Sequence, residues 1–247
     1  MPVKPMLLLA LILWGNSFSA GNDTLQNEIS HIDESQTVAE LQITELSNEK
    51  HGIRLFIPNG LIPALYHRRP ERVNDIYLCV PAAFTTPQNT IDGMYIEKGE
   101  VISQSSNSSL NGKCSIKNDS VEILTRSDFD ENTKSNLIQS KGGLFEQFLL
   151  IKNGEIIPCN AFKERKNLRR AIIKFKNYTC VGESKERQTI AEFQQLLKDL
   201  GAIDAIYCDM GTWSEGWYKD EQNNYITIGE NMTSTHRQTN WFVYKKP

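Results

Sequence analysis

The residues best equipped for chemistry stand together in one short segment, Asp209-Met210-Gly211-Thr212-Trp213-Ser214. It combines a carboxylate, two hydroxyl groups and a glycine, whose backbone can approach a ligand closely. A carboxylate can transfer a proton, and hydroxyl groups can bond the oxygens of a sugar or a phosphate. The segment therefore indicates a site for a sugar or a phosphate. The alternative is that Asp209 only forms an Asx turn with its own backbone and that the loop only changes direction.

The elements before this segment would hold Asp209 in a fixed place. Thr189 and Glu192 form a capping box at the start of a predicted helix over 189–200, and Gly201 is placed to end it in the left-handed conformation. The apolar stripe of this helix consists of Ile190, Phe193, Leu196, Leu197 and Leu200. A short apolar run over 205–208 follows and predicts a buried strand. Asp209 is thus expected at the carboxyl end of that strand, where loops commonly bind ligands.

Further strands are predicted from short runs of apolar and β-branched residues. They cover 53–57, 75–80, 225–228 and 241–244. Three hairpins are expected, over 95–102, 150–157 and 171–181. The stretch 103–120 is rich in Ser, Asn and Gly and predicts a long surface connection. These patterns favour an α+β fold in a single domain, with mixed, largely antiparallel twisted sheets built from hairpins and flanked by helices.

The N-terminus has the three-part form of a secretory signal. Lys4 precedes an apolar run over 6–14, and the small residues Ser17 and Ser19 follow, so we expect cleavage after Ser19. The run is shorter than the roughly 20 residues of a membrane-spanning helix, and no later segment is more apolar, so no membrane span is expected. The protein would be exported, to the periplasm or the extracellular space. The predicted organisation is a signal peptide over 1–19, a polar and weakly helical lead-in over 20–51, and one domain over 52–247.

Charge and motifs exclude several classes of protein. The net charge is -3 and the charges are interspersed, so no nucleic-acid partner is expected. The chain contains no Ser-His-Asp spacing, no phosphate loop and no H-E-x-x-H motif. No metal site and no cofactor are predicted, although a divalent cation stays open as an addition to the site.

The five cysteines are widely spaced and include no C-x-x-C pair, so they do not predict a zinc site. Cys79, Cys180 and Cys208 lie in apolar runs and are expected to be small buried side chains. Cys114 and Cys159 have more polar neighbours and are the better candidates for a disulfide.

The stretch over 189–209 resembles the signature of the phosphodiester glycosidase family. That signature is a capped helix, Leu-Gly-Ala, a buried strand, and Asp-Gly-Gly followed by small hydroxyl residues. Leu200-Gly201-Ala202 and Asp209 match it here. Other parts agree in order: Asn153-Gly154 looks like a hairpin of the family, 169–172 like its Arg-Thr-Ala-Ile strand entry, and 240–243 like its closing strand. The resemblance extends from about Ile76 to the C-terminus.

The chain departs from the family pattern in two places. The Asp-Gly-Gly motif is replaced by Asp209-Met210-Gly211, so one glycine is lost. Near the first buried strand, Pro81-Ala82-Ala83-Phe84 stands where the family usually has an Asn-Gly-Gly-Phe-Phe type of sequence, and this removes a polar side chain. Arg169, Asp209, Gly211 and Ser214 match the family.

The resemblance implies cleavage of a sugar from a phosphodiester or a related glycoside. That reaction needs an acid or base near the leaving oxygen and positive charge on the phosphate. Asp209 would be the acid, base or orienting carboxylate, and Arg169 a bidentate phosphate clamp. A second carboxylate is usual, for which Glu183 is proposed and Glu97 and Glu215 stay open. The residues expected to bind substrate are Gly211, Thr212, Trp213, Ser214 and His236.

Each of these residues also has a purely structural interpretation. Arg169 could belong to a solvated basic face, and Glu183 could be a turn residue after a glycine. Trp213 and Trp217 could stack on a sugar or pack over the edge of a sheet. His236 could be an acid or base, but a surface position fits its polar surroundings better.

Three functions follow from these patterns. The first is a secreted hydrolase that resembles phosphodiester glycosidases and takes a carbohydrate or sugar-phosphate ligand. The second is a non-catalytic protein on the same scaffold that binds a glycan or the cell envelope. The third is a structural envelope protein without a ligand, in which the Asp209 loop would have no role. The first requires that Asp209, Arg169 and a second carboxylate converge in one cleft.

Overall fold

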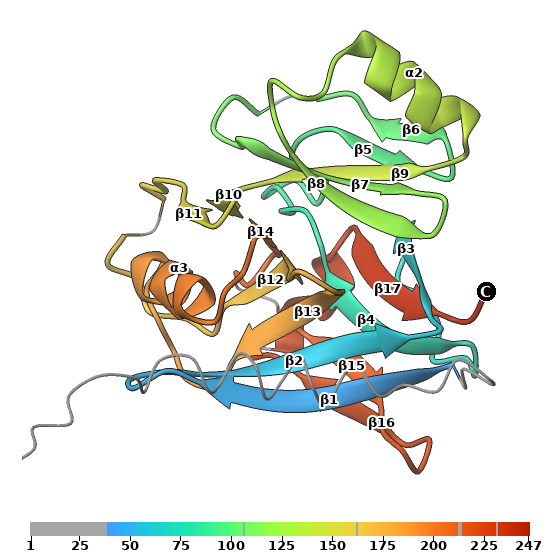
Figure 1. Cartoon of the computed structure of the whole chain (residues 1–247). Coiled ribbons are helices and arrows are strands. Elements are labelled where there is room, and N and C mark those ends of the chain that lie inside the picture. The colour runs from blue at the N-terminus through green and yellow to red at the C-terminus, as the bar shows by residue number, and fades with distance from the viewer. Residues whose placement is uncertain (1–38, 106, 162, 212–213, 231) are drawn as a thin grey trace, which may run out of the picture. The chain divides into compact units, whose positions relative to one another are not determined.

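The computed structural model describes residues 39–105, 107–161, 163–211, 214–230 and 232–247 (Figure 1). Within this part of the chain, the backbone forms three sheets, and every strand pairing is antiparallel. The described residues fall in one compact unit, Gln36–Pro247. Among them no helix is both long and apolar enough to cross a bilayer.

The largest sheet has seven strands and carries the Asp209 segment. In spatial order they are β1 (Glu40–Ser47), β2 (Gly52–Asn59), β13 (Thr179–Ser184), β12 (Arg170–Lys174), β14 (Asp204–Tyr207), β10 (Leu149–Lys152) and β11 (Glu155–Ile156). Strand β14 pairs with β12 on one side and β10 on the other, so it lies inside the sheet. All four of its residues are buried, and for Ala205, Ile206 and Tyr207 the apolar sequence predicts this.

Two five-stranded sheets complete the fold. The first contains, in order, β16 (Tyr225–Ile228), β15 (Gly216–Lys219), β4 (Ile76–Pro81), β17 (Trp241–Lys245) and β3 (Ile62–Tyr66). The second contains β6 (Glu100–Ser103), β5 (Tyr95–Glu97), β9 (Gly143–Gln147), β7 (Gly112–Lys117) and β8 (Ser120–Thr125). Phe56, Val80, Phe145, Ile206 and Phe242 belong to one buried cluster, so the three sheets share a core.

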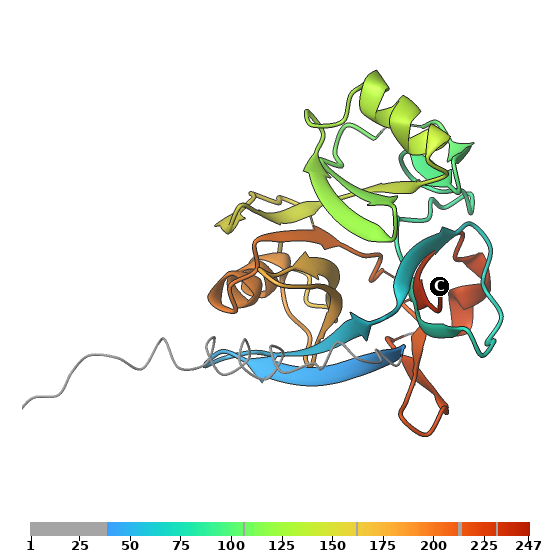
Figure 2. The same ribbon diagram turned by 45° about the vertical axis from the view of Figure 1, so that its right-hand side comes forward.

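The described helices are few and lie against the sheets. Helix α2 (Glu131–Gln139) lies on the outer side of the second five-stranded sheet, and α3 (Ile190–Asp199) lies beside the largest sheet, in Figure 2 as in Figure 1. A 3-10 helix, η1, covers Met232–Arg237. The antiparallel character of the predicted fold is confirmed, with fewer helices than the term α+β suggests.

The helix before Asp209 forms as its sequence predicts. The backbone N–H of Glu192 donates to the Thr189 hydroxyl at 3.1 Å, and the carboxylate of Glu192 accepts from the Thr189 N–H at 2.8 Å. This capping lowers the pKa of Glu192 to about 2, chiefly through the Thr189 N–H. Gly201 has a φ of +80° and ends the helix in the left-handed conformation. A tight connection then leads directly into β14.

The predicted hairpins over 95–102, 150–157 and 171–181 are all present as β5/β6, β10/β11 and β12/β13. Two other predictions are wrong. The weakly helical lead-in contains β1, which looks polar because it is an edge strand with one face in solvent. The predicted surface connection over 103–120 contains β7. Its Lys113 is buried in an ion pair with Glu146 of β9, and because a buried position carries a charged residue, the sequence of the strand does not look apolar. The division of the chain at residues 19 and 51 stays a prediction.

Cys114 and Cys159, the better candidates for a disulfide, do not form one, because all five cysteines are free thiols. Cys114 is fully buried in the core at strand β7, despite its polar neighbours in the sequence. Cys79, Cys180 and Cys208 are buried as predicted.

Candidate functional site

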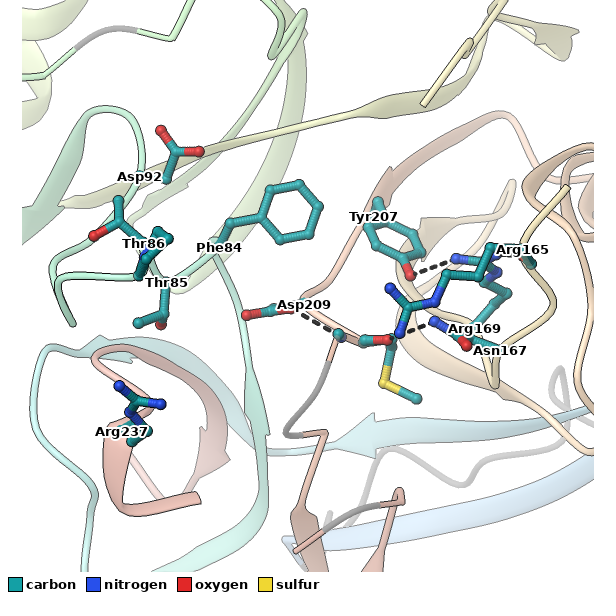
Figure 3. Close-up of a pocket in the computed structure, with 13 residues that line it drawn as sticks. Phe84, Thr85, Thr86, Asp92, Arg165, Asn167, Arg169, Tyr207, Asp209 and Arg237 are labelled. Carbon is teal, nitrogen blue, oxygen red and sulfur yellow. Dashed lines mark hydrogen bonds between the residues drawn. The ribbon is translucent and has the colours of Figure 1, made fainter. Parts of the chain in front are cut away.

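The structure places Asp209 where two sheets meet. Strand β14 ends at Tyr207, and the N–H of Asp209 donates to the carbonyl of Ala82 at 2.9 Å, directly after β4. A cavity of about 510 Å³ opens at this point (Figure 3). Its walls consist of Phe84, Thr85, Thr86, Pro87, Asp92, Arg165, Asn167, Arg169, Tyr207, Asp209, Met210, Gly211 and Arg237. The predicted position of Asp209 after the end of a buried strand is confirmed, and the structure adds that this strand end faces a cavity.

Asp209 is a buried carboxyl group with a displaced pKa. Burial raises its pKa to about 7, while hydrogen bonds from the backbones of Gly211 and Thr85 and the charge of Arg170 act in the opposite direction. The Gly211 N–H donates to Oδ1 at 3.0 Å, which is the Asx turn that the structural interpretation required. Because the same side chain also lines the cavity, the turn holds the carboxyl group in place without removing it from the site. A group with this pKa can both release and accept a proton near neutral pH.

Arg169 shares the cavity with Asp209, but its side chain is largely held by the protein. Nε donates to the carbonyl of Gln188 at 2.8 Å, Nη1 donates to the hydroxyl of Tyr207 at 3.0 Å, and Nη2 donates to the carbonyl of Arg165. Only 1% of Arg169 is exposed, so the solvated basic face is excluded for this residue. The positive charge of Arg169 lies at the cavity wall. Its guanidinium nitrogens already donate to protein oxygens, so the side chain does not offer a phosphate the pair of donors that the bidentate clamp requires.

Two further arginines in the walls were not predicted as site residues. Arg165 is exposed on the segment before Arg169, and Arg237 is exposed at the end of η1. In the view of Figure 3, Arg165 and Arg169 lie on one side of Asp209 and Arg237 on the other. The basic cluster Lys163-Glu164-Arg165-Lys166 and the His236-Arg237 pair were visible in the sequence, but nothing local indicated that Arg165 and Arg237 would face one cavity.

None of the three proposed second carboxylates lines this cavity. Glu183 forms an ion pair with the buried Arg170, Glu97 accepts from His67 Nδ1 at 2.6 Å, and Glu215 pairs with Arg69. The structure therefore does not bring them together with Asp209 in the cavity walls.

The second carboxylate of the cavity is Asp92, which the sequence did not single out. The side-chain amide of Asn107 donates to both carboxylate oxygens of Asp92, at 3.1 and 3.0 Å. The backbone N–H of Asp92 donates to the carbonyl of Phe84 at 2.8 Å. Asp92 lies in an irregular segment between β4 and β5, where neither strand nor helix periodicity applies. An Asp-Gly pair before a hairpin is the one local cue, and turns use it commonly.

The remaining predicted ligand-binding residues have different positions. Gly211 is exposed and lines the cavity, whereas Thr212 and Trp213 lie outside the described residues. The Ser214 hydroxyl donates to the carbonyl of Glu230 at 2.8 Å and accepts from the Glu230 N–H at 2.7 Å, so it joins two chain segments. His236 is exposed on η1 and is not part of the cavity wall.

Trp217 packs against the protein and does not face the cavity. It is fully buried on β15, and its ring packs edge-on against Tyr225 with centroids 5.1 Å apart. It is not available for stacking on a sugar.

The two departures from the family pattern both lie at the cavity wall. Met210 is 2% exposed and contributes to the wall, so a side chain occupies space that a glycine would leave open. Ala83 is held at its backbone by Asn240, whose Oδ1 accepts from the Ala83 N–H at 2.6 Å and whose Nδ2 donates to the Ala83 carbonyl at 3.0 Å. This clamp places Phe84 and Thr85 at the cavity.

Over the described ranges, no group of three or more His, Cys, Asp and Glu side chains is arranged to hold a metal ion.

A buried acid and several arginines around one cavity define a protein suited to an oxygen-rich, anionic ligand. A model of the phosphodiester glycosidase family matches residues 74–240, which is more than half of the chain. The protein therefore belongs to the phosphodiester glycosidase family.

The solved structures that are similar to this chain include one from zebrafish and one from Synechocystis. One is the catalytic domain of zebrafish N-acetylglucosamine-1-phosphodiester alpha-N-acetylglucosaminidase, auto-inhibited by its pro-peptide, with a TM-score of 0.58 and 13% identity over 87% of this chain and 85% of that one. The other is a hypothetical protein from Synechocystis, with a TM-score of 0.53 and 12% identity over 83% of this chain and 62% of that one. No curated protein matches the chain. At these identities, the two structures demonstrate a shared fold alone.

Proposed function

We propose that the protein is a hydrolase of the phosphodiester glycosidase type, which cleaves a sugar from a phosphodiester or a related glycoside. The observation that carries this proposal is the environment of Asp209. A buried carboxyl group with a pKa of about 7 lines the same cavity as Arg165, Arg169 and Arg237. A proton donor beside positive charge would suit the cleavage of a phosphodiester.

Each residue of the cavity is assigned one role in the proposed reaction. Asp209, protonated in part at neutral pH, would donate its proton to the oxygen that leaves the sugar. Asp92 would serve as the second carboxylate. It would act either as the base that activates a water molecule for attack on the sugar carbon, or as the nucleophile whose covalent sugar intermediate water then hydrolyses. Arg165 and Arg237 would bond phosphate oxygens, while Arg169 would add charge from a fixed position.

The substrate class follows from the family and from this charge pattern. The name of the zebrafish relative specifies a sugar linked through its carbon 1 to a phosphodiester. Three arginines in the wall of this chain's cavity favour the same class over a neutral glycoside. An aryl phosphodiester of N-acetylglucosamine 1-phosphate is therefore the first substrate to test.

The test compares the native protein with Asp209→Asn on that substrate. We expect kcat to fall by about a hundredfold or more, because the amide cannot donate the proton. Asp220→Asn is the matched control, since Asp220 also accepts a turn N–H, that of Asn224 at 2.7 Å, but lies outside the cavity wall. Equal rates for the native protein and Asp209→Asn would refute the assignment of Asp209.

A binding protein without turnover is the second candidate, and Met210 is the observation that favours it. The methionine side chain fills part of the wall where the family pattern has a glycine. Calorimetry with the same phosphodiester separates the two functions. Binding that Asp209→Asn retains, together with no turnover by the native protein, would establish the binding function.

Export to the periplasm or the extracellular space is part of the proposal and rests on the sequence around Lys4, 6–14 and Ser19. Expression of the full chain in a secreting host tests it. We expect the mature protein to begin at Ala20, and an intact N-terminus on intracellular protein would contradict export.

A further inference from the structure

Arg170 and Glu183 form a buried ion pair next to the candidate site. Arg170 is 0% exposed and Glu183 is 8% exposed. They are direct neighbours across the β12/β13 pairing, and Nε of Arg170 donates to Oε2 of Glu183 at 2.8 Å, with Nη2 donating to the same oxygen. A guanidinium group keeps its charge in proteins, so a buried one requires a nearby negative charge. Glu183 supplies that charge.

The same arginine is connected to the Asp209 segment at two points. Its carbonyl accepts from the N–H of Cys208 at 2.9 Å, directly before Asp209, and its Nη1 donates to the carbonyl of Ser214 at 3.2 Å. Arg170 therefore joins Glu183 to both ends of the loop that carries the carboxyl group of the site. Neither Arg170 nor Glu183 lines the cavity, so neither is positioned to contact a substrate there.

The charged and titratable groups around Asp209 differ in how they respond to pH. Tyr207 and Cys208 stay neutral, because burial raises the pKa of each to about 12. The remaining groups are Arg170 from β12 and the cavity residues Asp92, Arg165, Arg169 and Arg237. The charge of Arg170 lowers the pKa of Asp209, against the larger effect of burial, which raises it.

We propose that Glu183 is a positioning residue, which neutralises the buried Arg170 and holds it where it bonds both ends of the loop that carries Asp209. This inference rests on the proposed role of Asp209 as a proton donor. It gives Glu183 a function in the reaction that does not require contact with the substrate. A bare guanidinium at the position of Arg170 would favour the charged carboxylate and lower the protonated fraction of Asp209 at neutral pH.

The direct test measures the protonation of Asp209 by carbon-13 NMR of the aspartate carboxyl groups across a pH series. The signal of Asp209 is identified by its absence in Asp209→Asn. In Glu183→Gln, which keeps the shape and loses the charge, we expect the midpoint to fall by about one unit. In Glu183→Asp, which keeps the charge, we expect a midpoint close to that of the native protein.

A double variant, Arg170→Met with Glu183→Leu, removes both charges and keeps an apolar pair of similar volume. The fall in midpoint should disappear in this protein, because no unpaired cation remains. This variant also covers the case in which Glu183→Gln does not fold. A fall of a full unit in the double variant, or an unchanged midpoint in a folded Glu183→Gln, would overturn the proposal.

The NMR midpoint does not depend on turnover, so the outcome is separate from that of the proposed function. A protein without activity on any phosphodiester can still show the shift. If activity is present, the pH profile of kcat/KM for Glu183→Gln should move in the same direction as the midpoint. A purely structural role for Glu183 would lower the amount of folded protein and leave both pH values unchanged.

Discussion

Arg169 and Tyr207 form a bonded pair in the wall of the cavity, in which Nη1 donates to the tyrosine hydroxyl across 3.0 Å. The centre of the guanidinium group also lies 5.9 Å from the centroid of the tyrosine ring. Burial raises the pKa of Tyr207 to about 12, so the phenol stays protonated in the physiological range. The pair therefore provides a rigid, positively charged wall beside Asp209.

Loss of this pair should reduce stability. We expect Tyr207→Phe to lower the free energy of unfolding by about 1 kcal/mol, and Arg169→Lys to lower it by about 2 kcal/mol, because lysine cannot bond all three partners of the buried fork. The double variant should lose less than the sum, since the two residues share one bond. Urea denaturation measures all three. Arg165→Lys is the control, because only the carbonyl of Arg165 accepts from Arg169.

The pKa of Asp209 makes stability depend on pH in a defined direction. Its pKa is about 7 in the folded protein, against an ordinary value of 3.8. Between these values the folded state holds a proton that the unfolded chain has released, so the free energy of unfolding falls as pH rises. The stabilisation is complete below the ordinary value and is lost as pH passes the folded-state pKa. At about pH 8, the charged carboxylate should cost about 4 kcal/mol.

Asp209→Asn should remove this pH dependence. We expect the variant to match the native protein near pH 4 and to exceed its stability near pH 8, as measured by urea denaturation at a series of pH values. Asp220→Asn should keep the native slope. A native protein that gains stability from about pH 4 to 7 through Asp209 would contradict the raised pKa.

The position of Asp209 could be predicted because the signals that set it are local. The capping box of Thr189 and Glu192, the glycine at 201 and the apolar run of β14 all lie within a short stretch of chain. Each acts through backbone hydrogen bonding or periodicity, which the sequence displays directly.

The opposite wall of the cavity could not be predicted, because long-range contacts place it. Asn240 holds Ala83 across 157 residues of sequence, and this brings the segment from Phe84 to Asp92 to the cavity. For the same reason Glu183, which looks like a free carboxylate in the sequence, is engaged by its cross-strand neighbour Arg170. Pairing in antiparallel sheets depends on register, and register is not visible in either strand alone.

Arg165 and Arg237 should determine preference for a charged substrate. We expect Arg165→Gln and Arg237→Gln each to raise KM for an aryl phosphodiester about tenfold, because each removes a charge-assisted bond to phosphate. For a neutral aryl glycoside of the same sugar, KM should stay unchanged. Steady-state kinetics with both substrates provides the comparison.

Lys163→Gln is the matched control for these arginines, since Lys163 is exposed in the same basic cluster and does not line the cavity. If Lys163→Gln raises KM as strongly as Arg165→Gln, the effect comes from the positive electrostatic field of the whole basic cluster and not from a bond between Arg165 and the phosphate. The assignment of a phosphate site to the two arginines would then be wrong.

Met210 offers a test of whether the lost glycine limits activity. Met210→Gly removes a buried side chain from the cavity wall and should lower the free energy of unfolding by about 3 kcal/mol. It also restores the Asp-Gly-Gly pattern and enlarges the cavity, so we expect KM for the phosphodiester to fall about threefold. Met210→Leu keeps most of the volume and should leave KM unchanged. A fall in stability without any gain in kcat/KM would show that Met210 only fills space, and that the substrate of this chain already fits the narrower cavity.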